Sequence, residues 1–419
     1  MFKKIKKIED VVSWRLCNGC GACVYACKNN AIKLKNITEL GIRPIVNTNC
    51  RDCGECLKIC SGYYNRSCCR VNTKDSDPDY LPHWGPILEI FEGYATDDKI
   101  RHFGSSGGIV TALSLYCIEH ENADGIIHIN TDKNNPLQNC TAFSSTREKI
   151  IAATGSRYSP ASPCDNLYRF QSSKNGAVMV GKGCDISALR NAQNMDPIID
   201  DKTKCAIGIF CAGTPAALGT VDLLNSYGIP INRVREIRYR GMGWPGNFAV
   251  KKETETEFRS YATYQDSWGI AQRYRPFRCY LCPDGTAETA DISCGDSWYR
   301  KPEKNNQGHS LILVRTERGR RIIQGAIDKN YIAVTRTTLK ALELSQVNLK
   351  AKRGEIAGRM LMLNLAGIPT PKYHGWPLWK NWWKTGIKEK ARSLASTVKR
   401  ILSRRLYKKD TMFFYKENL

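Results

Sequence analysis

Two runs of four cysteines near the start of the chain restrict its fold more than any other feature. The runs consist of Cys17, Cys20, Cys23 and Cys27, followed by Cys50, Cys53, Cys56 and Cys60. Both have the spacing C-x2-C-x2-C-x3-C, in which three cysteines on a tight loop wrap one 4Fe-4S cluster. Small residues such as Gly19, Gly21 and Gly54 let the backbone close around it. Residues 1–75 are therefore expected to form an α+β, ferredoxin-like module with two clusters.

The spacing also predicts which cysteines share a cluster, because the fourth cysteine of each run binds the cluster of the other run. We therefore assign Cys17, Cys20, Cys23 and Cys60 to the first cluster, and Cys50, Cys53, Cys56 and Cys27 to the second. The alternative is a zinc module, but zinc knuckles usually pair two cysteines at this spacing and lack the third and fourth. One departure is that Lys28 and Ser61 replace the proline that usually follows each run.

The length, net charge and cysteine count of the chain restrict its number of domains, its partners and its compartment. Its 419 residues are enough for two or three domains. The formal charge of +23 counts every cysteine as neutral, and two or three bound clusters would lower it to roughly +17 to +19. The protein stays basic, which favours acidic partners or an anionic membrane surface. No signal peptide is evident, and the 19 cysteines are odd in number and clustered, so we expect a cytoplasmic protein.

Residues 86–345 alternate short apolar runs with helical stretches. Strands are expected at residues 125–130, 177–181, 206–210 and 310–315, and helices at residues 109–116, 186–192 and 216–224. A strand followed by a helix, repeated, predicts an α/β domain with a largely parallel sheet. Ligands of such sheets bind outside the carboxyl ends of the strands.

Four further cysteines fit that rule. Cys184 and Cys211 each come just after an expected strand, and Cys279 and Cys282 form a C-x2-C pair on a loop. We predict that these four thiols hold a third 4Fe-4S cluster at the sheet edge, with Cys294 as the alternative ligand. The competing interpretation of any one of them is a buried apolar thiol. Cys68 and Cys69 fit neither N-terminal cluster and are expected to be free.

A glycine- and serine-rich turn, residues 104–108, precedes the apolar helix that begins at Ile109. Glycines let a backbone approach a phosphate, and a helix start offers free N–H groups and partial positive charge. Such turns also cap helices for purely structural reasons. Residues 155–158 are a second, weaker candidate for a phosphate or ring contact.

The order of these motifs resembles the beta subunits of coenzyme F420 hydrogenase and dehydrogenase over about residues 10–345. The most specific part of the resemblance is the stretch Ala290-Asp-Ile-Ser-Cys-Gly-Asp-Ser-Trp298. The resemblance implies a bound FAD beside a 4Fe-4S cluster held by the central domain. It implies pyrophosphate contacts at Ser105, Ser106, Gly107, Gly108, Ser156, Arg157 and Tyr158. The family's Gly-Thr-Pro-Cys is Gly-Lys-Gly-Cys184 here, so the contacts of that loop differ.

The expected function is that of an iron–sulfur flavoprotein oxidoreductase. It would pass electrons between ferredoxin-type clusters and FAD and exchange hydride with a small-molecule carrier, of the F420 type by resemblance. The alternatives are an electron-relay subunit docked to a catalytic partner, or clusters kept as structural staples. No acid–base catalytic group is predicted. The ending at Trp298 and the tryptophan-rich tail are similar to family members found near bacterial surface-polysaccharide genes, which implies a link to that biosynthesis.

Residues 346–419 are expected to form a basic, tryptophan-rich helical tail. From Pro371 onward there are 13 Lys and Arg against 3 Asp and Glu. At helical spacing, one face carries Leu394, Val398, Ile401, Leu402 and Leu406. Such a helix either lies on the anionic inner face of a membrane, with tryptophans at the interface, or packs on its own domain or a partner. No nucleic-acid-binding module is evident.

Overall fold

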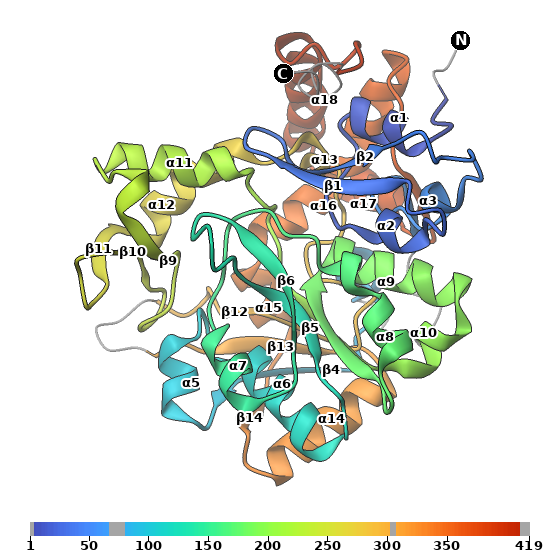
Figure 1. Cartoon of the computed structure of the whole chain (residues 1–419). Helices are drawn as coiled ribbons and strands as arrows, with labels where there is room; N and C mark the ends of the chain where they lie inside the picture. The colour runs from blue at the N-terminus through green and yellow to red at the C-terminus, as the bar shows by residue number, and fades with distance from the viewer. Residues whose placement is uncertain (1–3, 67–79, 302–306, 411–419) are drawn as a thin grey trace.

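Eight strands form a mixed sheet at the centre of the computed structural model, which describes residues 4–66, 80–301 and 307–410 (Figure 1). Their order is β14-β4-β13-β12-β8-β7-β5-β6. Strands β12, β8, β7 and β5 run parallel, as predicted, and the flanking strands join them antiparallel. The strands are β4 (Glu89–Ala95), β5 (Ile126–Thr131), β6 (Asn139–Ser144), β7 (Ala177–Lys182), β8 (Thr203–Ile209), β12 (Ile292–Asp296), β13 (Ser310–Val314) and β14 (Ile332–Arg336).

The sheet is buried on both faces, which explains the near-continuous apolar runs of its central strands. Along β7, Val178 and Val180 join the core on one face, and Met179 joins the core on the other. Helices α6 (Ile109–His120) and α14 (Glu317–Asp328) cover the first face, and α9 (Gly183–Met195) covers the second. The result is a three-layer α/β domain, and the four strands and three helices expected from the sequence are all present.

The N-terminal module packs directly on the second face of this sheet. It contains α1 (Ile8–Ser13), α2 (Ala22–Ala26), the antiparallel pair β1 (Ile32–Ile37) and β2 (Gly41–Val46), and α3 (Glu55–Lys58). Ala22 and Ala26 share a buried cluster with Ile186 of α9. Gly21 has a φ of +88°, and a β-carbon there would lie 3.0 Å from the backbone nitrogen of Asp165. Only glycine allows this close approach, so the first cysteine loop lies against the central domain.

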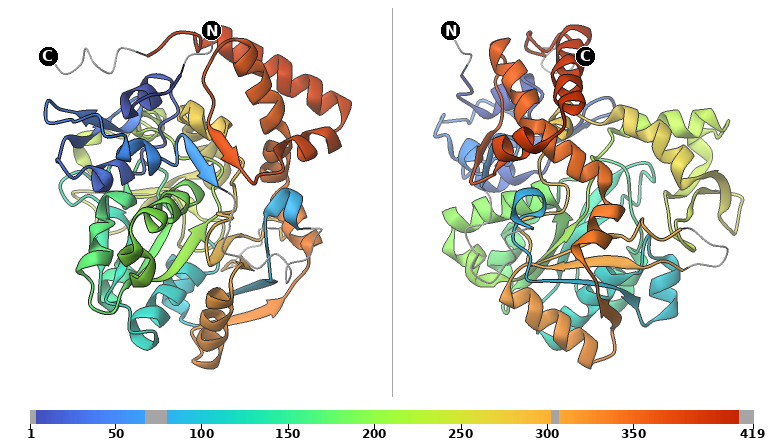
Figure 2. Two further views of the ribbon diagram at one scale, coloured as in Figure 1. Left: turned by 90° about the vertical axis from the view of Figure 1, so that its right-hand side faces the viewer. Right: turned by 180° about the vertical axis from the view of Figure 1, so that it is seen from behind.

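The C-terminal segment closes over the N-terminal module. Its elements are α16 (Val347–Leu365), β15 (Lys372–His374), α17 (Leu378–Lys384) and α18 (Ile387–Ser403). Figure 2 shows β15 beside β3 (Tyr64–Arg66), with which it pairs in parallel. Ile401 and Leu406 enter the core of the N-terminal module, and Lys409 pairs with Asp10 at 2.8 Å. The tail therefore packs on its own chain.

The prediction of a single apolar face on α18 is wrong. Ile401 and Leu406 are buried, whereas Val398 is 37% exposed and Leu402 is 64% exposed. Ser393 and Thr397 occupy the buried side instead, because small side chains let α18 approach α16 closely. The described part of the chain contains no helix long and apolar enough to cross a bilayer. Cys68 and Cys69 lie outside the described residues.

Shorter elements complete the molecule. A second sheet consists of β9 (Val234–Arg238), β10 (Asn247–Lys252) and β11 (Arg259–Thr263), all antiparallel. The other helices are α4 (Leu81–Trp84), α5 (Asp98–Phe103), α7 (Arg147–Ala152), η2 (Pro163–Asn166), α8 (Tyr168–Ser172), α10 (Pro197–Lys202), α11 (Ala217–Ser226), η3 (Ile231–Arg233), α12 (Tyr264–Ala271), η4 (Gln272–Tyr274), α13 (Phe277–Tyr280) and α15 (Leu339–Ser345).

A buried ion pair ties α16 to the loop that precedes β12. Glu288 and Arg353 meet at 2.6 Å, and each side chain is 2% exposed. Two other guanidinium nitrogens of Arg353 are buried without a hydrogen-bond partner in the described structure, so the arginine depends strongly on this carboxylate.

We expect Glu288→Gln to lower the free energy of unfolding by about 3 kcal/mol, because it leaves a buried charge uncompensated. Arg336→Gln is the control, since Arg336 is exposed where it pairs with Glu89, and its loss should cost less than about 1 kcal/mol. Anaerobic urea unfolding measures both. Equal effects of the two changes would contradict a structural role for the buried pair.

Candidate functional site

The candidate residues gather at one edge of the central sheet. At this edge, Lys182 at the end of β7 pairs with Ile209 at the end of β8. Asp296 at the end of β12 pairs with Ser310 of β13, and Ser310 pairs in turn with Gly93 of β4. These residues define the carboxyl edge of β4, β7, β8 and β12. The edge where parallel strands end is where α/β sheets bind ligands. Cys184 and Cys211 follow β7 and β8 directly, and residues 104–108 return to the end of β4 through a hydrogen bond from Ala95 N–H to the Gly107 carbonyl oxygen.

The structure brings the four central cysteines together. Burial raises the pKa of Cys184 well above its usual value, and the nearby thiols of Cys211 and Cys282 raise it further. Burial raises the pKa of Cys211 to about 11, with Cys279 and Cys282 acting in the same direction. The Cys211 N–H also donates to the Gly285 carbonyl at 2.8 Å, which holds the loop after Cys282 against the end of β8. A bound iron–sulfur cluster would deprotonate the four thiols, because thiolate is the ligand form.

Cys294 lies apart from this group. It sits within β12, is 3% exposed and packs with Ile207 and Ile312 in an apolar core. Burial alone raises the pKa of Cys294 to about 12, without a contribution from another thiol. It behaves as a core residue of the sheet, and the geometry favours Cys184 over Cys294 as a partner of the other three.

Cationic side chains surround the central thiols. Lys182 is half-buried and pairs with the buried Asp185 at 2.6 Å. Burial raises the pKa of Cys282, whereas Lys352 and Arg278 lower it. Positive charges near sulfur favour the thiolate and an anionic cluster. Lys182 belongs to the sequence Gly-Lys-Gly-Cys184, which replaces the Gly-Thr-Pro-Cys of the family. The loop before Cys184 therefore carries a positive charge in this chain.

The N-terminal cysteines fall into two sets. Burial raises the pKa of Cys23 well above its usual value, and Cys20, Cys17 and Cys60 raise it further. For the second set, burial raises the pKa of Cys56 to about 11, and the neighbouring groups that add to it include Cys53, Cys50 and Cys27. Cys60 therefore lies near Cys17 and Cys20, and Cys27 lies near Cys56. The exchanged assignment of ligands stays a prediction.

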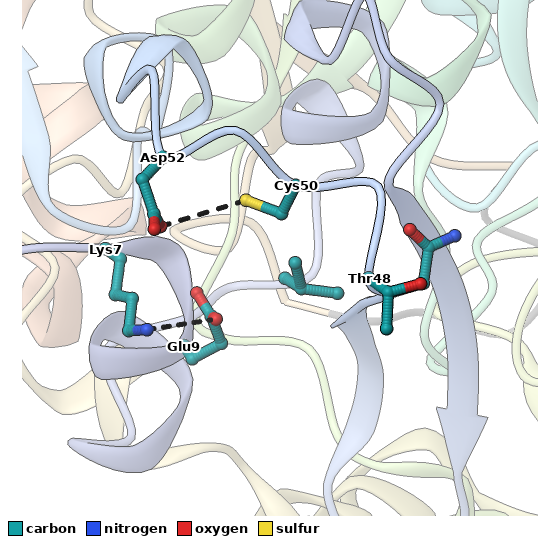
Figure 3. A pocket seen from close by; sticks show the side chains of 7 residues that line it. Lys7, Glu9, Thr48, Cys50 and Asp52 are labelled. Carbon is teal, nitrogen blue, oxygen red and sulfur yellow. Dashed lines mark hydrogen bonds and ion pairs between the residues drawn. The ribbon is translucent and has the colours of Figure 1, made fainter.

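The two sets differ in exposure. Cys17, Cys20, Cys23 and Cys60 are buried, whereas Cys50 and Cys53 are exposed. A pocket of about 480 Å³ opens beside Cys50 (Figure 3). Its lining includes Lys7 and Glu9, which form an ion pair at 3.9 Å, and Asp52, whose carboxylate accepts a 3.9 Å hydrogen bond from the Cys50 thiol. The second set therefore reaches solvent.

Across the described residues, no three His, Cys, Asp or Glu side chains converge to hold one metal ion. A 4Fe-4S cube takes one thiolate at each of its four iron atoms. The ligands of such a cube would surround a volume and would not meet at one point.

The two Gly-Ser segments meet at the start of α6. The Ser156 N–H donates to Ser105 Oγ at 2.6 Å. Other groups in the first segment are already engaged, since Ser106 Oγ donates to the His309 carbonyl and Gly107 N–H donates to Ser310 Oγ. A β-carbon at Gly107 would lie 2.5 Å from the Gly93 carbonyl oxygen, so this glycine serves chain packing.

Arg157 and Tyr158 point into the protein. Arg157 hydrogen-bonds to Asn139 and to the carbonyl groups of Pro136 and Ile237. Tyr158 packs against the ring of Trp268. Both side chains are therefore engaged within the protein, and any phosphate contact here falls to the backbone of the segment.

Two arginines that sequence reasoning missed lie beside the Gly-Ser loops. Arg101, on α5, donates to the Gly308 carbonyl at 3.2 Å, and its Nε is buried with no hydrogen-bond partner among the described residues. Arg238, on β9, donates to the carbonyl oxygens of Phe103 and Thr154. Their charges, together with the N-terminus of α6, fit a diphosphate. The only sequence signal for a role of Arg101 is its position three residues before the Gly-Ser turn.

An aromatic cluster borders the same edge. Arg240 forms a two-pronged ion pair with Asp296, at 2.6 and 2.9 Å, and Trp244 Nε1 donates to the same carboxylate. The rings of Tyr264 and Trp298 stack with centroids 5.3 Å apart. The Gly-Asp-Ser-Trp motif thus supplies both the acid and one ring of this cluster, a role that the sequence did not reveal.

The central site predicts a specific pattern of iron loss. Changing Cys184, Cys211, Cys279 or Cys282 to Ser should lower iron content by about one third, because one of three equal cubes is lost. Cys294→Ser should leave it unchanged. Iron and acid-labile sulfide analysis after anaerobic purification measures this. A loss caused by the Cys294 change but not the Cys184 change would contradict the site.

Three family models match the chain. The 4Fe-4S dicluster domain matches residues 16–62. The N-terminal model of the coenzyme F420 hydrogenase/dehydrogenase beta subunit matches residues 90–169, and the C-terminal model matches residues 175–340. The matched segments coincide with the cysteine module, with the Gly-Ser loops and with the central cysteines.

Individual relatives also carry the names of F420-dependent enzymes or of their subunits. The chain is 24% identical over 372 residues to the coenzyme F420-dependent sulfite reductase of Methanocaldococcus jannaschii, covering 84% of this chain but only about half, 52%, of that protein. It is 24% identical over 300 residues to the coenzyme F420 hydrogenase subunit beta of Methanococcus voltae, covering 69% of this chain and 99% of that subunit.

A solved structure shares the fold. A chain of the F420-reducing NiFe hydrogenase complex from Methanosarcina barkeri superposes with a TM-score of 0.53 at 23% identity. The superposition covers 69% of this chain and 97% of that one.

Proposed function

Because the chain belongs to the coenzyme F420 hydrogenase/dehydrogenase beta subunit family, we propose that it is an iron–sulfur flavoprotein oxidoreductase passing electrons between 4Fe-4S clusters and FAD. The observation that carries the proposal is the carboxyl edge of the sheet, where the Gly-Ser loop after β4 and the cysteines after β7 and β8 lie in one row. FAD would supply two-electron hydride chemistry, and the clusters would carry single electrons. The protein supplies their positions and burial.

Exposure supports an order for the three cysteine sites. The second N-terminal set, with Cys50 and Cys53, is exposed and suits exchange with an external redox protein. The first set is buried between it and the central domain. The central set lies at the same edge of the sheet as the candidate flavin site. Electrons would cross the chain through these sites in that order, in either direction.

The candidate flavin site consists of the Gly-Ser segments and the arginines beside them. Ser105 and Ser156 join the two segments, and Arg101 and Arg238 carry positive charge next to them. These groups, with the first-turn N–H groups of α6, would hold the pyrophosphate of FAD. Because Ser106, Gly107 and Arg157 are already hydrogen-bonded within the protein, we propose that they shape the loop.

A hydride carrier of the coenzyme F420 type is the substrate that we propose, since relatives carry the names of F420-dependent enzymes. The alternative, an electron-relay subunit docked to a catalytic partner, is supported by the relatives that are named as subunits. Turnover of reduced F420 with an artificial dye by the isolated chain separates the two. A link to surface-polysaccharide biosynthesis in the cytoplasm remains a prediction from the motif ending at Trp298.

Arg101→Gln should lower bound flavin several-fold without changing iron content, because it removes one charge next to the pyrophosphate. Arg147→Gln is the matched control, since Arg147 lies on the surface and pairs with Glu119 and Asp97. Flavin released on denaturation, measured by absorbance against protein, is the readout. Full flavin content in the Arg101 variant would contradict the placement of the diphosphate.

We also propose that α18 contacts an anionic membrane surface. Its outer side carries Ile387, 85% exposed, together with Val398 and Leu402, which share one face at helical spacing. The basic residues Lys388 and Lys399 border this stripe and are exposed. The exposed rings of Trp379 and Trp383 on α17 extend the apolar surface. An apolar stripe bordered by cations matches the interface of an anionic leaflet.

Co-sedimentation with vesicles tests this contact. Ile387→Glu and Leu402→Glu should each weaken binding to anionic vesicles by about tenfold, because each removes an apolar contribution of at least about 1.5 kcal/mol. Ile198→Glu, at an exposed apolar residue of α10, is the control and should not affect binding. Binding should also weaken with salt, since exposed charges are screened beyond about 10 Å at 0.1 M. Equal binding by all three variants would overturn the proposal.

A further inference from the structure

Arg278 connects the loops of two cysteine sets. It directly precedes Cys279 on α13 and is only 3% exposed. Its Nε donates to the carbonyl oxygen of Gly62 at 2.7 Å, and its Nη2 donates to that of Ser61 at 3.3 Å. Arg278 is next to Cys279 of the central set in sequence, and its guanidinium binds the backbone just after Cys60, the last cysteine of the second N-terminal run.

The backbone that Arg278 binds lies against the sulfurs of the first N-terminal set. A β-carbon added at Gly62 would lie 3.3 Å from Cys60 Sγ and 3.4 Å from the α-carbon of Cys17. Ser61 Oγ donates to Cys20 Sγ at 3.7 Å and accepts from Asn18 Nδ2 at 3.0 Å. Any shift of residues 61–62 would therefore move the surroundings of the first cluster.

Arg278 also places a buried positive charge between the two sets, because it is next to Cys279 in sequence and binds the backbone that follows Cys60. The side chain lies near the Tyr373 ring, 5.6 Å from its centroid, and the Tyr373 hydroxyl donates to the Leu281 carbonyl. Strand β15 thus encloses the arginine from outside and excludes water.

We propose that Arg278 is a positioning residue that fixes the spacing between the first N-terminal cluster and the central cluster and holds one positive charge between them. The inference rests on the proposed function, because it requires both clusters. Two consecutive carbonyl groups match the fork of a guanidinium, which a lysine cannot reproduce. The charge favours the reduced form of each cluster, which carries one more negative charge.

The test compares Arg278→Gln and Arg278→Lys in the anaerobically purified full chain. Redox titration followed by electron paramagnetic resonance reports the midpoint potential of each cluster and the magnetic interaction between reduced clusters. Arg278→Gln should shift the potentials of the first and central clusters to lower values and leave the second, exposed cluster unchanged. Arg278→Lys keeps the charge, so the potentials should stay close to those of the parent protein. The magnetic interaction should nevertheless change, because the fork is lost.

Arg315→Gln is the matched control. Arg315 is fully buried and donates to the carbonyl groups of Trp84, Pro86 and Thr286. It should lower the unfolding temperature without shifting either potential selectively. If Arg278→Gln moves the two potentials no more than this control does, the proposal is overturned.

Two further outcomes are decisive. If Arg278→Gln does not retain its iron, the test rests on Arg278→Lys. An unchanged magnetic interaction between the reduced clusters of that variant would overturn the proposal. If the parent protein itself holds about eight iron atoms in place of about twelve, the central cluster is absent and the proposed function fails first. Twelve iron atoms with unchanged potentials would overturn only the role of Arg278.

Discussion

The close packing of the first cysteine loop against the central domain is the constraint on which the rest of the structure depends. Gly21 touches Asp165, and Ser162 donates to the Gly19 carbonyl at 2.6 Å. Helix α2 completes the apolar cover of the sheet. Because the module supplies part of the core, its cysteines are held at fixed positions relative to those at the sheet edge. A loosely tethered ferredoxin module could not do this.

That packing accounts for the gradient of exposure along the cysteine sets. The first set is enclosed by the sheet, by α13 and by the C-terminal segment. In the second set Cys50 and Cys53 are exposed, and Cys50 lies beside Lys7 and Glu9 (Figure 3). Burial lowers the local dielectric and strengthens every charge interaction. The inner sites are therefore where single residues such as Lys182 and Arg278 have the largest influence.

Much of this organisation could be predicted from the sequence, for identifiable reasons. Buried central strands such as β7 are short apolar runs, and the rule that ligands gather at carboxyl ends led to Cys184 and Cys211. The antiparallel flanks were missed, because an apolar run does not reveal its direction. The prediction for α18 is wrong because helical spacing groups Val398, Ile401 and Leu402 but does not reveal which of these side chains the rest of the protein covers. Arg278 was missed because its partners lie more than 200 residues away.

The central claim is that one chain holds three cysteine-ligated clusters in series with a flavin. Iron, acid-labile sulfide and flavin analysis of the anaerobically purified chain tests it most directly. The account predicts about twelve iron and about twelve sulfide per chain, because each cube contains four of each, together with one releasable FAD. About eight iron atoms and no flavin would contradict it.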